Sequence, residues 1–389
     1  MIDYSSLISD KARVIKPSGI RKFFDIVSTM EDAISLGVGE PDFQTPWQIR
    51  RAGINSLKQG KTFYTSNWGL VDLRKEIAKY AKEQYNLDYD YRKEIIVTVG
   101  GSEAIDNALR SFVSDGDEVL IPEPSFVCYS PLTTLAGGKA VPLTTRMEDG
   151  FKLKAETLKK AITPRTKVLI MPFPNNPTGA IMTREDLEEI AAVLRDTNIV
   201  VISDEIYCEL TYGGKKHVCF AELPGMRERT IVINGFSKSY AMTGWRLGWV
   251  MAPKEMLEPL VKIHQFGIMS APTVSQFAGI EAMRTGADDV EYMREQYDMR
   301  RRYCYNRLNE MGMPCFEPEG AFYIFPSIQK YMEDDEEFCD RLLNSKKVAV
   351  VPGSAFGESG RGHVRISYAY SMMQLETAFD RIEEFIKEL

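Results

Sequence analysis

Histidine is scarce in this sequence, and cysteine never occurs in closely spaced pairs. The 389 residues include 3 histidines and 6 cysteines, and no two cysteines form a CxxC pair. This pattern lacks zinc-site spacing, argues against metal-dependent hydrolysis and gives little support to a cysteine–histidine nucleophile pair. We therefore expect no metal, and we interpret the cysteines as free thiols of a reducing cytosol rather than a disulfide framework. That interpretation predicts a cytoplasmic protein.

A surplus of positive charge is also missing, as are long apolar runs. The formal net charge is −7 at pH 7, and no basic run reverses it locally. This charge argues against sequence-independent binding of nucleic acid or of an acidic membrane. No apolar run approaches the ~20 residues of a membrane helix, and the start, MIDYSSLISDK, lacks the apolar core of a secretory signal. We expect no nucleic-acid partner and no membrane.

The chain does contain short apolar runs, rich in valine and isoleucine, between about residues 50 and 285. Helical patterns such as SEAIDNALRSFV and TREDLEEIAAVLRD lie between several of them. Near-continuous apolar runs are typical of strands buried on both faces, so the alternation predicts an α/β fold with a mostly parallel sheet. Such sheets bind ligands beyond the carboxyl ends of their strands. The seven runs are EIIVTV, DEVLIP, KAVPL, KVLIMP, NIVVIS, TIVIN and LGWVMA.

The pattern changes after about residue 286. A long charged helix over roughly 287–311 precedes the short strands AFYIFP, VAVVPG and HVRISYA and a final helix, QLETAFDRIEEFIKEL. These elements predict a smaller α+β domain. Near the start, one helical segment around GIRKFFDIVSTM precedes a turn region, GVGEPDFQTP. We therefore divide the chain into residues 1–48, which pack with the small domain, a large domain, 49–285, and the small C-terminal domain, 286–389.

Two strand ends carry glycine and asparagine. In VTVGGSEA, Gly101 and Ser102 could cradle a phosphate at a helix N-terminus, although Ser102 could instead be a simple helix cap. The motif matches neither the dinucleotide nor the nucleoside-triphosphate pattern. In MPFPNNPTGA, Asn175 and Asn176 either form a turn before a helix capped by Thr183 or direct an amide into a cleft.

Two further strand ends carry charge. VVISDEIYCEL places Asp204 and Glu205 after the most apolar strand, with Tyr207 three residues beyond Asp204. An acid that faces solvent is ordinary, whereas one that faces a low-dielectric cleft needs a cationic partner. In FSKSYAMTGWRLG, Lys238 lies between two serines and Arg246 follows. A strand-end lysine near positive charge can lose its proton and attack carbonyl groups.

The small domain adds one more candidate. Arg365 lies within the strand of GHVRISYA, where it is either a charge on the strand face or a buried partner for a carboxylate. A lysine amine, an aspartate, a tyrosine, an asparagine, a glycine-rich anion site and two arginines are thus predicted near strand ends. One ligand that uses all of them is pyridoxal phosphate together with an amino-acid substrate.

The chain resembles the class I/II aminotransferases of pyridoxal-phosphate fold type I. It is closest to the branch with bacterial and archaeal aspartate, aromatic and N-acetyl-diaminopimelate aminotransferases. The resemblance implies a large domain with a mostly parallel seven-stranded sheet between helices, and a smaller α+β domain. Blocks in matching order run nearly from end to end: SLGVGEPDFQTP, YTSNWGLVDLR, TVGGSEAI, NNPTG, SDEIY, SKSYAMTGWRLG, GAFYIFP and VRISYA.

The resemblance also implies roles for individual residues. Lys238 is similar to the lysine that forms the Schiff base and moves the substrate α-proton, and Asp204 to the partner of the pyridinium nitrogen. Tyr207 and Asn176 resemble contacts of the cofactor's phenolic oxygen. Phe126, in EPSFVCY, stands where the family stacks an aromatic ring on the cofactor. The implied phosphate contacts are Gly101, Ser102, Ser237 and Arg246.

Substrate and subunit contacts follow from the same resemblance. Arg365 and the backbone N–H of Gly39 are implied to bind the substrate α-carboxylate, with Asn176 beside them. Tyr64 resembles the tyrosine that reaches the cofactor phosphate of the neighbouring subunit, which implies a homodimer with shared active sites. The segment KIHQFGIMSAPTVSQ departs from strict aspartate aminotransferases, because it has no arginine for a distal carboxylate.

The expected reaction is transfer of the α-amino group of an L-amino acid to a 2-oxo acid, in two half-reactions through pyridoxamine phosphate. Gln265, Phe266 and Met269 suggest a softer pocket, so we expect a broad, aromatic or aliphatic donor rather than only an aspartate-like one, with 2-oxoglutarate as acceptor. Two alternatives stay open. One is a carbon–sulfur β-lyase on the same fold with the same cofactor, and the other is a regulatory protein of another class, which holds the cofactor without catalysis.

Overall fold

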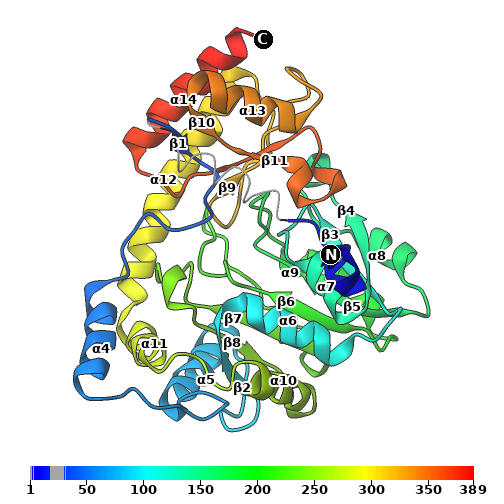
Figure 1. Ribbon diagram of the computed structural model, residues 1–389, viewed down its shortest axis with the longest axis vertical. Coiled ribbons are helices and arrows are strands. Elements are labelled where there is room, and N and C mark those ends of the chain that lie inside the picture. The colour runs from blue at the N-terminus through cyan, green and yellow to red at the C-terminus, as the bar shows by residue number, and fades with distance from the viewer. Residues whose placement is uncertain (1, 3, 18–29, 31) are drawn as a thin grey trace.

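The computed structural model describes residue 2, residues 4–17, residue 30 and residues 32–389. The helical segment expected near residues 19–30 lies, except for its last residue, outside the described residues. Figure 1 shows a large sheet flanked by helices, with a smaller group of strands and helices above it in the view. The longest helix, α12, runs along both groups.

The large sheet is formed by the seven predicted apolar runs, which confirms that prediction. Its order is β2-β8-β7-β6-β5-β3-β4, and all neighbouring pairs are parallel except those that β8 makes with β2 and β7. The reversed strand therefore starts where the others end. The strands are β2 (Ile95–Thr98), β3 (Glu118–Glu123), β4 (Lys139–Thr144), β5 (Thr166–Met171), β6 (Val200–Asp204), β7 (Thr230–Gly235) and β8 (Gly248–Met251).

Helices cover both faces of this sheet, which is why its strands are apolar on both sides. Ile202 packs in the cluster of α6 (Gly100–Phe112), α7 (Tyr129–Ala136) and α10 (Lys254–Gly267). Its neighbour Val201 packs on the other face, with α8 (Ala155–Ala161) and α9 (Arg184–Leu194). That face continues over α5 (Val71–Tyr85) and α11 (Thr273–Thr285), and α4 (Trp47–Lys58) packs against α11.

The smaller group follows the predicted order. The long helix α12 (Ala287–Met311) has the predicted bounds, and the final helix α14 (Met372–Lys387) begins two residues earlier than predicted, because Ser371 closes a capping box with Gln374. Between them lie a three-stranded antiparallel sheet, β11-β12-β9, and α13. Their bounds are β9 (Tyr323–Ile324), α13 (Asp335–Lys346), β10 (Val348–Ala349), β11 (Val351–Pro352) and β12 (Val364–Ser367).

The N-terminal residues contact both groups. β1 (Ile34–Ser35) pairs in parallel with β10, whereas α2 (Asp10–Arg13), which follows α1 (Tyr4–Leu7), packs on α7. There Lys11 Nζ lies 3.1 Å from Asp115 Oδ1. The division at residues 48 and 285 stays a prediction. The 3₁₀ helices are η1 (Met147–Asp149), η2 (Phe220–Glu222), η3 (Arg227–Arg229), η4 (Thr243–Trp245), η5 (Gly353–Phe356) and η6 (Glu358–Gly360).

Two predictions from composition concern the whole chain. All six cysteines are free thiols, as predicted. Among the described residues, no helix has both the length and the apolar character needed to cross a membrane.

Candidate active site

A cavity of about 470 Å³ lies at the carboxyl ends of the sheet strands, between the two groups of elements. Every predicted site residue except Tyr64 lines it. The reversed direction of β8 explains why so many meet there. Gly248, the first residue of β8, pairs with Gly235 and Thr98 at the ends of β7 and β2. The segment of residues 236–247 therefore stays at this edge and carries both Lys238 and Arg246.

Lys238 directs its amine into the cavity. The Nζ atom donates a hydrogen bond to the carbonyl oxygen of Gly39 at 2.6 Å. Burial, together with the positive charges of Arg365 and Arg246, lowers the pKa of Lys238 to about 8, although the carboxylates of Glu40 and Asp204 oppose this shift. An amine with this pKa is partly neutral near physiological pH, so it can act as a nucleophile or a base.

The structure separates the two adjacent acids at the end of β6. Asp204 faces the cavity, where its carboxylate accepts hydrogen bonds from the Tyr129 hydroxyl at 2.7 Å and from the Ile206 N–H at 3.2 Å. Burial raises the pKa of Asp204, and these hydrogen bonds oppose the rise. Glu205 does not line the cavity; it accepts a 2.8 Å hydrogen bond from Ser203 and lies 2.8 Å from His217.

The start of α6 forms the anion end of the cavity. Helix α6 begins at Gly100, and its N-cap residue, Val99, makes no side-chain capping bond. Ser102 therefore lies inside the first turn, and its interpretation as a simple cap is wrong. Gly100 has φ +78°, and a Cβ there would lie 2.8 Å from Nη2 of Arg246. Glycine thus allows the guanidinium to approach the helix N-terminus, where N–H groups and the helix dipole favour an anion.

The opposite end of the cavity holds a buried arginine. The side chain of Arg365 on β12 is enclosed, and its residue is only 2% exposed. Its Nη1 donates to Asn176 Oδ1 at 2.8 Å and its Nη2 donates to the carbonyl of Gly37, while its Nε has no hydrogen-bond partner among the described residues. In the described part of the chain, no carboxylate lies within 4 Å of this guanidinium. A buried guanidinium with unused N–H groups is a ready partner for a carboxylate.

The neighbouring asparagines have different tasks. Asn175 forms the turn, because its Oδ1 accepts hydrogen bonds from the N–H and the hydroxyl of Thr178. Asn176 lines the cavity. The predicted cap of α9 is also confirmed, since Thr183 and Asp186 form a capping box.

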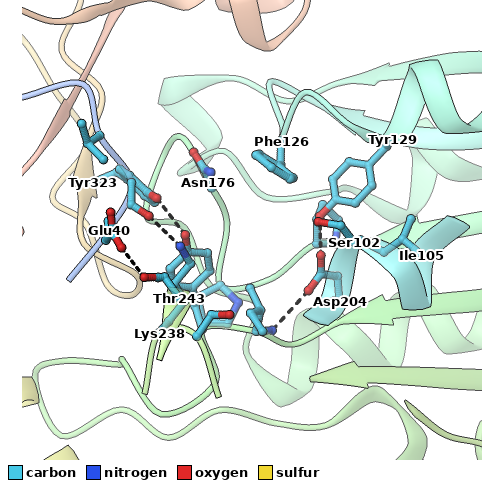
Figure 2. A pocket seen from close by; sticks show the side chains of 18 of the residues that line it. Glu40, Ser102, Ile105, Phe126, Tyr129, Asn176, Asp204, Lys238, Thr243 and Tyr323 are labelled. Atoms are coloured by element: carbon cyan, nitrogen blue, oxygen red, sulfur yellow. Dashed lines mark hydrogen bonds between the residues drawn. The ribbon is translucent and has the colours of Figure 1, made fainter. Parts of the chain in front are cut away.

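Several lining residues were not singled out from the sequence. Tyr129 contacts Asp204, and the hydroxyl of Tyr323 lies 2.8 Å from that of Tyr207. Thr243 donates a hydrogen bond to Glu40 at the cavity mouth. Figure 2 shows Tyr323 and Glu40 on one side of the cavity, Asp204 and Tyr129 on the other, and Phe126 and Asn176 above the space between them. Both tyrosines lie in aromatic-rich apolar stretches, so their sequence signal is that of core residues.

Tyr64 lies outside this cavity. It is 82% exposed, and Phe63, Phe266 and Met269 are exposed as well, the phenylalanines by 79% and 87%. The structure does not bring Tyr64 to the site of its own chain. Its predicted contact with a neighbouring subunit therefore stays a prediction, as does the pocket role of residues 265–269.

Comparisons with known proteins agree with this geometry. Residues 31–382 match the model of the family described as aminotransferase class I and II. An aspartate aminotransferase of Pyrococcus abyssi is 48% identical over 98% of this chain and 98% of its own. An aromatic-amino-acid aminotransferase of Thermococcus litoralis is 45% identical over the same shares. The crystal structure of an aromatic aminotransferase from Pyrococcus horikoshii has a TM-score of 0.90 at 46% identity, covering 94% of this chain and 99% of that one.

Proposed function

This chain belongs to the class I and II aminotransferases, and on that premise we propose that it transfers the amino group by a ping-pong reaction at the cavity. The net reaction would move the α-amino group of an L-amino acid to a 2-oxo acid, with pyridoxal phosphate as the cofactor that carries the group between them. One observation carries this proposal: a lysine amine with a pKa of about 8 lies in one cavity with a buried aspartate, an anion end and a buried arginine whose Nε has no partner among the described residues.

The residues present fit pyridoxal phosphate. The glycine at position 100 leaves room for Arg246 beside the uncapped start of α6, which suits a phosphate, and the buried carboxylate of Asp204 suits a protonated ring nitrogen. When bound, the cofactor supplies a carbonyl group for the amine and a ring that withdraws electrons. We assign its binding to Gly101, Ser102, Phe126, Asn176, Asp204, Tyr207, Ser237, Lys238 and Arg246.

The lysine and the aspartate divide the chemistry. Lys238 Nζ accepts the proton from the substrate α-carbon. Burial and the nearby arginines lower the pKa of this amine to about 8, so part of it is unprotonated near neutral pH and can act as the base. Asp204 keeps a proton on the ring nitrogen through its negative charge, and the hydroxyl of Tyr129 holds that carboxylate in place. Tyr207 and Asn176 would donate hydrogen bonds to the phenolic oxygen of the bound cofactor, and Phe126 would pack against its ring.

Arg365 orients the amino acid. Its guanidinium, with the N–H of Gly39, binds the α-carboxylate and so turns the α-C–H bond toward Lys238. The hydrogen bond to Asn176 Oδ1 fixes the guanidinium before substrate arrives. Preorganisation of this kind reduces the entropy that binding has to overcome.

The lining favours a broad, aromatic or aliphatic donor. Of the described residues that line the cavity, the cations are Lys238, Arg246 and Arg365, and each already has a role. The apolar residues that line the cavity include Val38, Ile105 and Phe126. This supports the expectation from the sequence that strict selection of a second carboxylate is absent, and we keep 2-oxoglutarate as the acceptor.

We also propose a homodimer with shared active sites. Phe63, Tyr64 and Phe266 expose large aromatic rings, and exposed aromatic groups of this kind are typical of protein interfaces. In the dimer, Tyr64 would reach the cofactor phosphate of the other subunit. Sedimentation tests the oligomeric state, and we expect a dimer for both the wild type and Tyr64→Phe. The variant should bind the phosphate of the cofactor more weakly than the wild type does.

A half-reaction screen tests the function and identifies the donor. Purified protein is loaded with pyridoxal phosphate, and single amino acids are added without an acceptor while the visible absorbance and the products are followed. Transamination predicts loss of the visible band with one equivalent of 2-oxo acid per site. Repeated turnover that yields ammonia and pyruvate from cystathionine, without loss of the band, would instead indicate a β-lyase. A band that no amino acid changes would indicate the non-catalytic alternative.

A further inference from the structure

Tyr323 lies between Tyr207, the residue assigned to the cofactor, and Arg365, the residue assigned to the substrate carboxylate. It belongs to β9, is 1% exposed and lines the cavity. Its hydroxyl is 2.8 Å from the hydroxyl of Tyr207, and its ring centre is 4.5 Å from the guanidinium carbon of Arg365. One side chain therefore contacts the predicted partner of the phenolic oxygen and the predicted carboxylate clamp.

The direction of the hydrogen bond between the two phenols follows from the proposed function. A phenol has one donor and can accept hydrogen bonds as well. If Tyr207 donates to the phenolic oxygen of the cofactor, it cannot donate to Tyr323, so Tyr323 must be the donor of the 2.8 Å bond. Burial raises the pKa of both phenols, and the positive charge of Arg365 opposes the rise in both.

The backbone leaves the Tyr323 hydroxyl little freedom. A Cβ placed on Gly39 would lie 2.2 Å from the hydroxyl oxygen, so the hydroxyl occupies the space that a side chain would need. Phe356 lies on Arg365 as well, at 4.8 Å from its guanidinium carbon. The hydroxyl and the guanidinium are thus both held by packing before any ligand binds.

We propose that Tyr323 is a positioning residue that fixes the Tyr207 hydroxyl toward the cofactor and holds the guanidinium of Arg365 for the substrate carboxylate. The inference rests on the proposed function, because it assigns Tyr207 to the phenolic oxygen. The hydroxyl and the ring of Tyr323 have separate roles. The hydroxyl serves the cofactor through Tyr207, and the ring serves the substrate through Arg365.

A pH titration of the bound cofactor's visible absorbance tests the hydroxyl. The variants are Tyr323→Phe, Tyr207→Phe and the double variant. Deprotonation of the bound cofactor increases the negative charge on its phenolic oxygen. A firmly held hydrogen-bond donor stabilises this charge. Tyr323→Phe should therefore raise the midpoint by roughly half a pH unit, the effect of a modest hydrogen bond. In the Tyr207→Phe background, the same substitution should leave the midpoint unchanged, because Tyr323 acts through Tyr207.

Tyr368→Phe is the matched control. Tyr368 is fully buried in the same group of elements, and its hydroxyl donates to the carbonyl of Ala321 at 3.2 Å without lining the cavity. It should leave the midpoint at its wild-type value. A shift of equal size in the wild-type and Tyr207→Phe backgrounds, or an equal shift in Tyr368→Phe, would overturn the role of the hydroxyl.

The ring is tested separately with 3-phenylpropionate, an unreactive carboxylate, titrated into the loaded enzyme. Tyr323→Phe keeps the ring and should keep the dissociation constant within about twofold, whereas Tyr323→Leu should raise it roughly tenfold. Equal affinities in the two variants would contradict the role of the ring. A wild-type protein without a pH-dependent cofactor band would instead contradict the proposed function, so the two failures are distinguishable.

Discussion

The two sides of the cavity are built in different ways. The sheet side, formed by Gly101, Ser102, Asp204, Ser237, Lys238 and Arg246, comes from turns and helix starts at one edge of one sheet. The clamp side, formed by Gly39, Tyr323 and Arg365, joins segments far apart in the sequence: the bond from Arg365 to Gly37 spans 328 positions. Topology thus places the sheet side, whereas packing between distant segments places the clamp side. We expect changes on the sheet side to lower kcat, and changes on the clamp side to act mainly on KM.

The largest expected effect is on the sheet side, at Lys238. Lys238→Ala removes both the nucleophile and the base, so kcat should fall by about 10⁴-fold. Stopped-flow absorbance of a single half-reaction measures this loss. The variant should still bind the cofactor through the other sheet-side residues, and dialysis followed by phosphate analysis is the control. A variant with near wild-type turnover would place the base elsewhere.

The second-largest loss of kcat is expected at Asp204 and distinguishes this residue from the adjacent Glu205. Asp204→Asn keeps the shape of the side chain but removes the charge that faces the cavity, so kcat should fall by about 10³-fold. Glu205→Gln is the matched control, because Glu205 contacts Ser203 and His217 outside the cavity. It should lower the free energy of unfolding by about 1–3 kcal/mol and leave kcat within about threefold. Equal losses of kcat in both variants would contradict the separation.

On the clamp side, Arg365→Lys should act on substrate binding. A lysine keeps the positive charge but loses the planar pair of donors, so KM for the amino acid should rise roughly tenfold to a hundredfold while kcat changes less. Steady-state kinetics with the donor found in the half-reaction screen measures both constants. If kcat fell as far as in Asp204→Asn, the two sides would not divide catalysis and binding as proposed.

The last prediction concerns a pH dependence that sharpens the role of the sheet side. Protonated Lys238 cannot attack a carbonyl, and its pKa is about 8. The rate of cofactor attachment to cofactor-free protein should therefore rise about tenfold per pH unit below pH 8 and level off above it. Stopped-flow absorbance between pH 6 and pH 10 gives the profile. A rate that rises up to the ordinary lysine range near 10.4 would contradict the lowered pKa.

The sequence predicts the sheet side better than the clamp side, for physical reasons. Strands buried on both faces leave continuous apolar runs, and the polar turn after each run locates residues such as Lys238. Which of two adjacent residues faces the cavity depends on the strand's exact end, so the pattern could not choose between Asp204 and Glu205. Tyr323 was missed because a tyrosine inside an aromatic-rich strand has the same pattern as a core residue. Its role depends on Arg365 and Tyr207, which only the folded chain brings near it.

The long helix α12 gives the two sides a mechanical connection. Its 25 residues extend for about 37 Å, and it packs on α11 near one end and on α14 and β9 farther along. Along it, Arg300 bonds Asp42 at 2.7 Å and lies over the ring of Phe43, next to the Gly39 loop. A tilt of only about 5° at the first turn would move the far end by roughly 3 Å. A rotation of this size would therefore displace one side of the cavity relative to the other by about the length of a hydrogen bond.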